Sequence, residues 1–287
     1  MKVLVFGATG QVARELQRRA GGIALDVRGR ATADFTDPES CAAALRATDA
    51  DAVINAVGYT AVDTAEEEED LAHAVNATTP GVIARAAATR GLPFVQISTD
   101  YVFDGAGAAP FPVDAPTGPL GAYGRSKLLG EDQVRAAGGV HAILRTSWVV
   151  SAHGRNFVKT MLRLGATRDR LTVVADQVGG PTPAAAIADL CLTAAAQLLE
   201  DPGKSGTYHL SGGPNVSWAD FAREIFAQAG FGCEVVDIPS SDYPTPARRP
   251  MNSRLDNSLT QAIFGLDRPD WRQGLRDILK DLGALRT

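Results

Sequence analysis

Residues 2–13 of the chain read KVLVFGATGQVA. The apolar run at residues 2–6 predicts a buried strand, the glycines after it predict a tight turn, and residues 14–20 predict a helix. In this context, glycines let the backbone approach a pyrophosphate at the positive end of the helix dipole. Ala13 replaces the third glycine of the usual fingerprint, a packing position that alanine can fill. We expect dinucleotide binding here rather than an ordinary βα turn. The candidate residues are Gly7, Gly10, Gln11 and Val12.

The second predicted strand, residues 23–27, contains Asp26 and is followed by Arg28. An acid about twenty residues beyond the glycine turn binds the adenosine ribose of NAD, whereas an arginine there binds the 2′-phosphate of NADP. Both residues are present, so the choice between the two cofactors stays open. Asp34 and Phe35 follow and are expected either to flank the adenine or to form only a loop before the next helix.

A third predicted strand, residues 51–56, precedes Val57, Gly58 and Tyr59. Parallel sheets bind ligands beyond the carboxyl ends of their strands, so we expect these three residues to line the cofactor. The acidic run at residues 66–70 predicts the solvated start of a helix rather than a metal site.

The fourth predicted strand, residues 93–97, leads to Thr99. Tyr123 and Lys127 follow, four residues apart in a helix-favouring segment, which places both side chains on one helix face. A phenol has a pKa near ~10, and a neighbouring cation lowers that pKa toward the range in which proton transfer is useful. The YxxxK spacing is weak evidence alone, but Thr99 at the same sheet edge strengthens it. Residues 105–121 are rich in Gly, Pro and Ala and suit a lid.

Strands and helices alternate up to a fifth predicted strand at residues 142–145, which predicts a doubly wound parallel sheet of the Rossmann type. Residues 1–150 are expected to form this NAD(P)-binding domain, with residues 184–211 returning to it. Residues 151–183 and 212–287 are expected to form a smaller substrate-binding part. Arg248 and Arg249 either face an anionic substrate there or pair with surface acids. After residue 150 we expect helices at 156–164, 184–199, 217–229 and 275–282, strands at 171–174, 208–212 and 234–238, and a turn-rich loop at 176–182.

Composition excludes several classes of protein. The net charge of −5 and the lack of a basic cluster argue against nucleic-acid binding. No segment approaches the ~20 apolar residues of a membrane span, and the first apolar run is too short for a signal peptide. Three scattered cysteines and four isolated histidines form no disulfide framework or metal motif. We expect a cytoplasmic protein.

Seven motifs occur together in one order along the chain: GATGQ (7–11), STDYVFD (98–104), YGRSK (123–127), RTSW (145–148), DQVGGPT (176–182), YHL (208–210) and ARRPMNS (247–253). Together they resemble the dTDP-4-dehydrorhamnose reductase family of the extended short-chain dehydrogenase/reductase superfamily, over almost the whole chain.

This resemblance implies reduction of the C4 ketone of dTDP-4-dehydro-L-rhamnose by NADPH or NADH, the last step of dTDP-L-rhamnose synthesis. It implies that Tyr123 donates a proton, that Lys127 binds the nicotinamide ribose and that Thr99 binds the reacting oxygen. It also implies a possible homodimer and possible magnesium, for which no ligands can be assigned. The substrate candidates are Thr99, Asp100, Tyr101, Trp148, Asn156 and Arg249.

Two other interpretations stay open. Related nucleotide-sugar dehydratases and epimerases resemble the chain, but the dehydratases place a pair of acids after the threonine, and here Asp100 is followed by Tyr101. A regulatory subunit of methionine adenosyltransferase resembles the same family without catalysis. The joint presence of Thr99, Tyr123 and Lys127 favours an enzyme over such a binding module.

Overall fold

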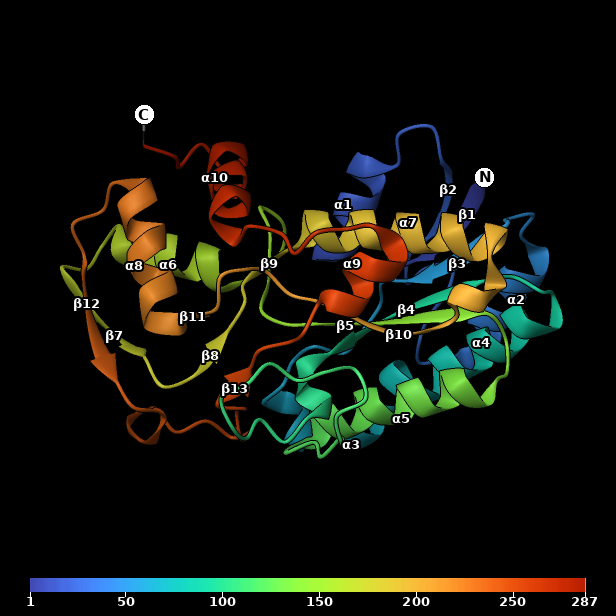
Figure 1. Ribbon diagram of the computed structural model, residues 1–287, viewed down its shortest axis with the longest axis horizontal. Coiled ribbons are helices and arrows are strands. Elements are labelled where there is room, and N and C mark those ends of the chain that lie inside the picture. The colour runs from blue at the N-terminus through green and yellow to red at the C-terminus, as the bar shows by residue number, and fades with distance from the viewer. Residues whose placement is uncertain (287) are drawn as a thin grey trace.

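The structure, a computed structural model, describes residues 1–286. A parallel sheet of six strands forms its centre (Figure 1). In chain order the strands are β1 (Lys2–Phe6), β2 (Ala24–Arg28), β3 (Ala52–Asn55), β4 (Phe94–Thr99), β5 (His141–Thr146) and β10 (Gly206–Leu210). Their spatial order is β10-β5-β4-β3-β1-β2, and every neighbouring pair is parallel. The expected doubly wound parallel sheet is confirmed. The chain reverses direction across the sheet between β1 and β3, where such sheets bind ligands.

Helices cover both faces of the sheet, which is why its strands are continuous apolar runs. On one face α1 (Gln11–Arg19) packs on α7 (Ala184–Glu200), beside α9 (Ser258–Phe264). On the other face lie α2 (Pro38–Ala47), α4 (Thr79–Thr89) and α5 (Ala122–Ala136). Each face has its own buried cluster, one around Leu16 and Ile187 and the other around Leu45 and Ile83.

A second part of the molecule lies beyond the carboxyl ends of the central strands (Figure 1). Its helices α6, α8 and α10 and the parallel pair β7–β12 enclose a third apolar cluster, which contains Phe221 and Trp271. Two short sheets, β6-β9 and β11-β8-β13, are separate from the central sheet. The bounds are α6 (Phe157–Gly165), α8 (Trp218–Ala229), α10 (Trp271–Asp281), β6 (Val149–Val150), β7 (Arg170–Val174), β8 (Val178–Gly179), β9 (Thr182–Pro183), β11 (Val216–Ser217), β12 (Glu234–Ile238) and β13 (Asn252–Ser253).

Side-chain caps explain where two of these helices begin. The Ser217 hydroxyl accepts a hydrogen bond from the Asp220 amide at 3.0 Å, so α8 begins where the sequence predicted. The Asn156 side chain accepts one from the Lys159 amide at 3.2 Å at the start of α6.

Several predicted boundaries were wrong. Helix α1 begins at Gln11 rather than at residue 14, α10 begins at Trp271 rather than at residue 275, and α9 was not predicted. The loop predicted at residues 176–182 contains the short strands β8 and β9. None of the helices within residues 1–286 combines the length and the hydropathy needed to cross a bilayer.

The segment after the acidic run is more varied than the single helix predicted to begin there. It consists of the 3-10 turn η1 (Thr64–Glu66), the helix α3 (Glu69–His73) and the π-helical turn η2 (Ala74–Thr78), which leads directly into α4. Pro80 lies in the first turn of α4 and has no amide hydrogen to donate to the preceding turn, which favours the wider π turn there. The remaining 3-10 turns are η3 (Asp100–Val102), η4 (Pro202–Lys204) and η5 (Ser240–Asp242).

Candidate functional site

The turn between β1 and α1 leaves backbone amides free at a helix N-terminus. Gly7 has a φ of +108°, and a Cβ added there would lie 3.2 Å from the backbone of Ala56, so glycine is required. Gly10 is the N-cap of α1 and supplies no side-chain cap. Unpaired amides at such a position suit a pyrophosphate, so the turn fits the dinucleotide that the sequence implies.

Gln11 links this turn to the second part of the molecule. Its side-chain oxygen accepts hydrogen bonds at 2.8 Å from both the Ser151 hydroxyl and the Asn156 side-chain amide. Asn156, a predicted substrate contact, therefore has its amide nitrogen bonded to Gln11 of the glycine turn and its oxygen to the start of α6.

At the end of β2, Arg28 and Asp26 form an ion pair with 2.7 Å between Nε and Oδ1. The Thr48 hydroxyl also donates to Asp26, at 3.1 Å. The bond from Arg28 holds the pKa of Asp26 below its usual value. The two residues that were predicted to choose between NAD and NADP therefore form one unit.

Asp34 and Phe35, the predicted adenine contacts, make local and core interactions instead. The ring of Phe35 is buried edge-on against Phe6, with 5.7 Å between the ring centroids, so this side chain serves the core. The Asp34 side chain accepts from the amide and hydroxyl of Thr36, each at 2.9 Å.

Tyr123 and Lys127 lie on α5 and face the end of β4. Lys127 is buried and donates from Nζ to the Ile97 carbonyl at 2.6 Å. A Cβ placed on Gly58 would lie 3.9 Å from that Nζ, so the loop after β3 borders the same space. The Tyr123 ring meets the Tyr101 ring edge-on, with 5.3 Å between their centroids. The predicted Thr99, Tyr101, Tyr123 and Lys127 are thus neighbours.

Burial dominates the titration of this cluster. It raises the pKa of Tyr123, and only the hydrogen bond with Thr99 opposes the rise. Burial also lowers the pKa of Lys127 to about 8, against the pull of the Glu131 carboxylate. The predicted lowering of the Tyr123 pKa by Lys127 is not seen here: besides burial, the neighbouring Asp100 and Tyr101 also raise this pKa.

Asp100, which follows Thr99, is buried and polar. Its Oδ1 accepts from the Thr99 hydroxyl at 3.0 Å, and within residues 1–286 its Oδ2 has no hydrogen-bond partner. Burial raises the pKa of this carboxyl to about 6, although the Thr99 hydrogen bond and the nearby Ser253 hydroxyl oppose the rise.

Arg249 and Trp148 are two further predicted substrate contacts. Arg249 donates to Asp63 at 2.6 Å and lies within hydrogen-bond reach of Tyr101. Trp148 has a φ of +48°, unusual for a bulky residue, and stacks on Trp218 with 3.5 Å between the rings. Such a strained backbone held by a stacked ring is characteristic of functional sites.

Comparison with known proteins agrees with this geometry. The family model described as RmlD substrate binding domain matches residues 1–284. The dTDP-4-dehydrorhamnose reductase of Salmonella typhimurium is 42% identical over the full length of both chains. The chain belongs to the dTDP-4-dehydrorhamnose reductase family.

Solved structures of family members have the same fold. The Clostridium acetobutylicum dTDP-4-dehydrorhamnose reductase aligns with a TM-score of 0.92 and 36% identity, covering 99% of this chain and all of that one. The Bacillus anthracis dTDP-4-dehydrorhamnose reductase, solved in complex with NADP, aligns with a TM-score of 0.90 and 33% identity, covering 98% of this chain and 99% of that one.

Sequence reasoning missed Asn76, which lies in the π turn of this reductase-family chain. Its side-chain oxygen accepts from the Tyr59 amide at 2.9 Å, and its nitrogen donates to the Tyr59 carbonyl and the Ser126 hydroxyl, both at 3.0 Å. Asn76 therefore joins the predicted cofactor loop to the helix of Tyr123. The only signal in the sequence was an asparagine shortly before a proline inside a predicted helix.

The acidic run is not merely solvated, as was predicted. Glu66 accepts from the Ala122 amide at 2.9 Å at the start of α5, and Glu69 accepts from Arg125 at 2.9 Å. Glu68 accepts from the Tyr59 hydroxyl at 2.6 Å. Three of the five acids thus dock the α5 helix and the loop after β3. Acid runs are usually solvated, and their partners here lie more than fifty residues away or in a loop, so spacing could not predict this.

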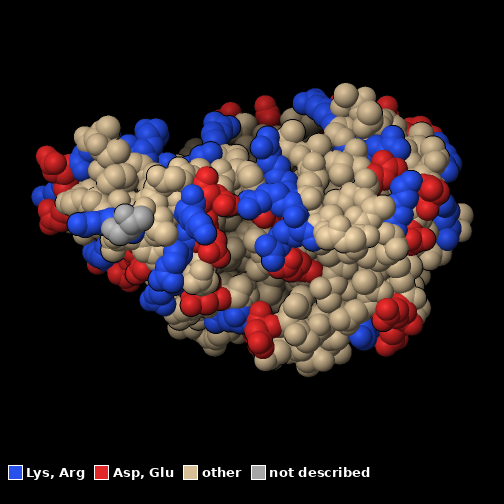
Figure 2. All heavy atoms as spheres, turned by 90° about the horizontal axis from the view of Figure 1, so that it is seen from above, with Lys and Arg blue, Asp and Glu red and all other residues tan. Residues whose placement is uncertain are grey.

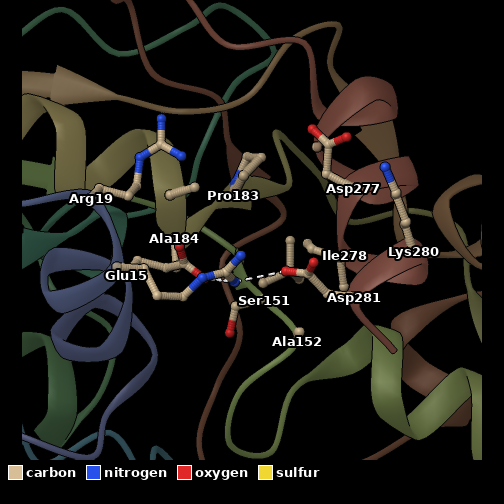
Figure 3. A pocket seen from close by; sticks show the side chains of 14 residues that line it. Glu15, Arg19, Ser151, Ala152, Pro183, Ala184, Asp277, Ile278, Lys280 and Asp281 are labelled. Carbon is tan, nitrogen blue, oxygen red and sulfur yellow. Dashed lines mark hydrogen bonds and ion pairs between the residues drawn. The ribbon is translucent and has the colours of Figure 1, made fainter. Parts of the chain in front are cut away.

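A separate cavity of about 320 Å³ opens between α1, α7 and α10. Figure 2 shows this face hollowed near its middle, with basic side chains around the hollow. Glu15, Arg19 and Ser151 point toward it on one side and Asp277 and Lys280 on the other (Figure 3). Tyr123, Lys127 and Thr99 do not line this cavity, so it is distinct from the predicted catalytic cluster. Within residues 1–286, no group of three or more His, Cys, Asp and Glu side chains is arranged to hold a metal ion.

Proposed function

We propose that the chain reduces the C4 ketone of dTDP-4-dehydro-L-rhamnose to dTDP-L-rhamnose with NADPH. The observation that carries the proposal is the cluster of Thr99, Tyr123 and Lys127 at the end of β4, beside a glycine turn suited to a dinucleotide. Reductases of this name at 42% identity support the substrate, and the NADP complex of the Bacillus anthracis relative supports the cofactor.

When bound, NADPH supplies the hydride. Tyr123 stays protonated at neutral pH because burial raises its pKa, and it donates that proton to the C4 oxygen as negative charge develops there. The Thr99 hydroxyl, turned from Asp100 toward the substrate, donates a hydrogen bond to the same oxygen and stabilises its charge. Lys127 holds the ribose next to the nicotinamide, and its positive charge favours the tyrosinate that remains after proton transfer.

The rest of the chain divides into two roles in this proposal. Residues 1–150 with 184–211 hold the cofactor. Residues 151–183 and 212–287 hold the nucleotide sugar, with Arg249 facing its phosphates and Trp148 and Tyr101 facing the rings. Dehydration is disfavoured because Tyr101 stands where a dehydratase has its second acid.

The proposal is tested by following NADPH absorbance after adding dTDP-4-dehydro-L-rhamnose, with dTDP-L-rhamnose identified as the product. Tyr123→Phe should lower kcat at least about 100-fold, the effect of removing a general acid, and leave NADPH binding intact. The exposed Tyr243→Phe is the control and should match the wild type. Tight NADPH binding by the wild type without turnover would instead support a binding module.

A further inference from the structure

Two buried charged residues, one of them in the RTSW motif, have no place in the mechanism above. Glu131 lies on α5 one turn beyond Lys127 and is fully buried, and Arg145 lies on β5 and is 4% exposed. They form a two-point ion pair, with Nε to Oε1 at 2.9 Å and Nη2 to Oε2 at 2.7 Å. Burying two charges is costly unless every polar atom finds a partner, so a pair in this position calls for an explanation beyond stability.

The two residues just before Thr99 are bonded to Glu131 and to Lys127. The Ser98 hydroxyl donates to Glu131 Oε1 at 2.6 Å, and the Ile97 carbonyl accepts from Lys127 at 2.6 Å. Helix α5 therefore bonds to two consecutive residues of β4 through Lys127 and Glu131, which are four residues apart. The next residue on that strand is Thr99. A shift of Glu131 would move Thr99 relative to Tyr123.

Arg145 extends the connection to residues 105–121. Its Nη1 donates to the Val113 carbonyl at 3.0 Å, and its guanidinium lies 5.0 Å from the centre of the Phe103 ring. Phe103 in turn stacks on Phe111, with 4.5 Å between the rings. The loop beside the site is thus tied to the same carboxylate that contacts β4.

We propose that Glu131 and Arg145 are positioning residues, which hold Thr99 and Lys127 in catalytic register and tie residues 105–121 to the α5 helix. This inference rests on the proposed function, the reduction of the C4 ketone.

Few titratable groups lie near Glu131 and Arg145. Burial alone would raise the pKa of Glu131, but bonds from Arg145 and Ser98 hold it below the usual value, so the carboxylate stays ionised. Arg135 also donates to Glu131, at 3.2 Å. His209, near Arg145, stays neutral because burial lowers its pKa to about 4. Asp100 and Tyr101 face Tyr123 from η3. Of these groups, Glu131 is the one that acts on Lys127.

Glu131→Gln is the main test, because it keeps the shape of the side chain and removes its charge. We expect kcat to fall about 10–100-fold through misplacement, with KM changing less. We expect kcat to fall at alkaline pH when Lys127 loses its proton. Without the Glu131 carboxylate, Lys127 should lose its proton more easily, so this fall should occur about one pH unit lower. Asp132→Asn is the matched control, since this acid is the next residue on the helix and its side chain is 60% exposed; it should behave as wild type.

Arg145→Lys is the second variant. It leaves Glu131 charged but cannot reproduce the two-point contact or the bond to Val113. We expect a lower kcat, but the alkaline fall of kcat should occur at the same pH as in the wild type. This distinguishes Arg145→Lys from Glu131→Gln, in which the fall should move to lower pH. Thermal unfolding shows which variants are folded at assay temperature. If Glu131→Gln is unfolded, the kinetics of Arg145→Lys test the inference instead.

A folded Glu131→Gln with wild-type kcat and alkaline limb would overturn the inference, and so would Arg145→Lys with wild-type kcat. If the wild type binds NADPH without turnover, the proposed function fails, and the affinity for NADPH measured by fluorescence against pH replaces kcat. The inference then predicts that Glu131→Gln loses affinity at lower pH than the wild type, and identical curves would refute it.

Discussion

Asp63 and Arg249, 186 residues apart in the chain, are joined by an ion pair of 2.6 Å between Oδ2 and Nη2. The other oxygen of Asp63 accepts from the Ala247 amide at 3.1 Å. The Asp63 side chain is 40% exposed, so the pair adds little stability and acts mainly by orienting Arg249. The loop after β3 thereby sets the direction of a cation in the loop before β13.

Arg249→Gln should raise KM for the dTDP-sugar about 10–100-fold, the effect of one lost charge-assisted hydrogen bond, with a smaller change in kcat. Arg248→Gln provides the control, because Arg248 is the adjacent arginine and is exposed. Steady-state kinetics on both variants tests this. Equal KM values in the two variants would remove Arg249 from the substrate site.

Arg28→Gln should weaken NADPH more than NADH, by about 10-fold in the ratio of KM values, because the guanidinium would no longer be available to a 2′-phosphate. It would also free the Asp26 carboxylate for a ribose hydroxyl. The two cofactors are compared on wild type, on Arg28→Gln and on Arg46→Gln, an exposed arginine of α2. An unchanged ratio in Arg28→Gln would show that this pair does not choose the cofactor.

Asp100→Asn should stabilise the folded protein at pH 8 by about 1–3 kcal/mol while impairing turnover. The folded-state pKa of Asp100, about 6, lies above the unfolded value near ~3.9, so the folded state binds the proton more tightly. The stability that this proton contributes is complete below pH ~4 and is lost as pH rises through 6. Denaturant unfolding of both proteins at pH 4 and pH 8 measures the difference. A gain of equal size at both pH values would contradict this assignment.

Gly124→Ala should reduce kcat at least about 100-fold, because a shift of the catalytic groups by about 1 Å can lower the rate by that factor. A Cβ at this position would lie 2.3 Å from the Tyr101 carbonyl oxygen, so α5 must move away from η3 and carry the adjacent Tyr123 with it. Gly232→Ala meets nothing within 4 Å and should leave kcat unchanged. Wild-type activity in Gly124→Ala would mean that the close approach of α5 is not needed.

The central sheet and the Tyr123 helix were predictable because local patterns determine them. Apolar runs with a glycine near one end marked β1, β3 and β4, and the spacing of Tyr123 and Lys127 placed both on one helix face. Family motifs extended this to Trp148 and Arg249, which spacing alone could not have linked to the site.

What the sequence could not show is the set of partners that hold the site in place. Asn76, Glu66 and Arg145 act through contacts with residues that are distant in the chain or in another element, and no local pattern encodes such contacts. The short helix α9 was missed because seven residues are too few for a clear period.

The π turn at residues 74–78 also sets the rotational phase of everything that follows it. Each residue of an α-helix advances the chain by about 100°, so removing one residue from this turn would rotate the whole of α4 by that angle. Ala84 and Ala88 would then occupy the core positions of Ile83 and Ala87, and Arg85 would take the place of the buried Ala84. Chain length is therefore constrained here more tightly than residue identity, and we expect insertions and deletions to be tolerated in the loops around it but not between Ala74 and Thr78.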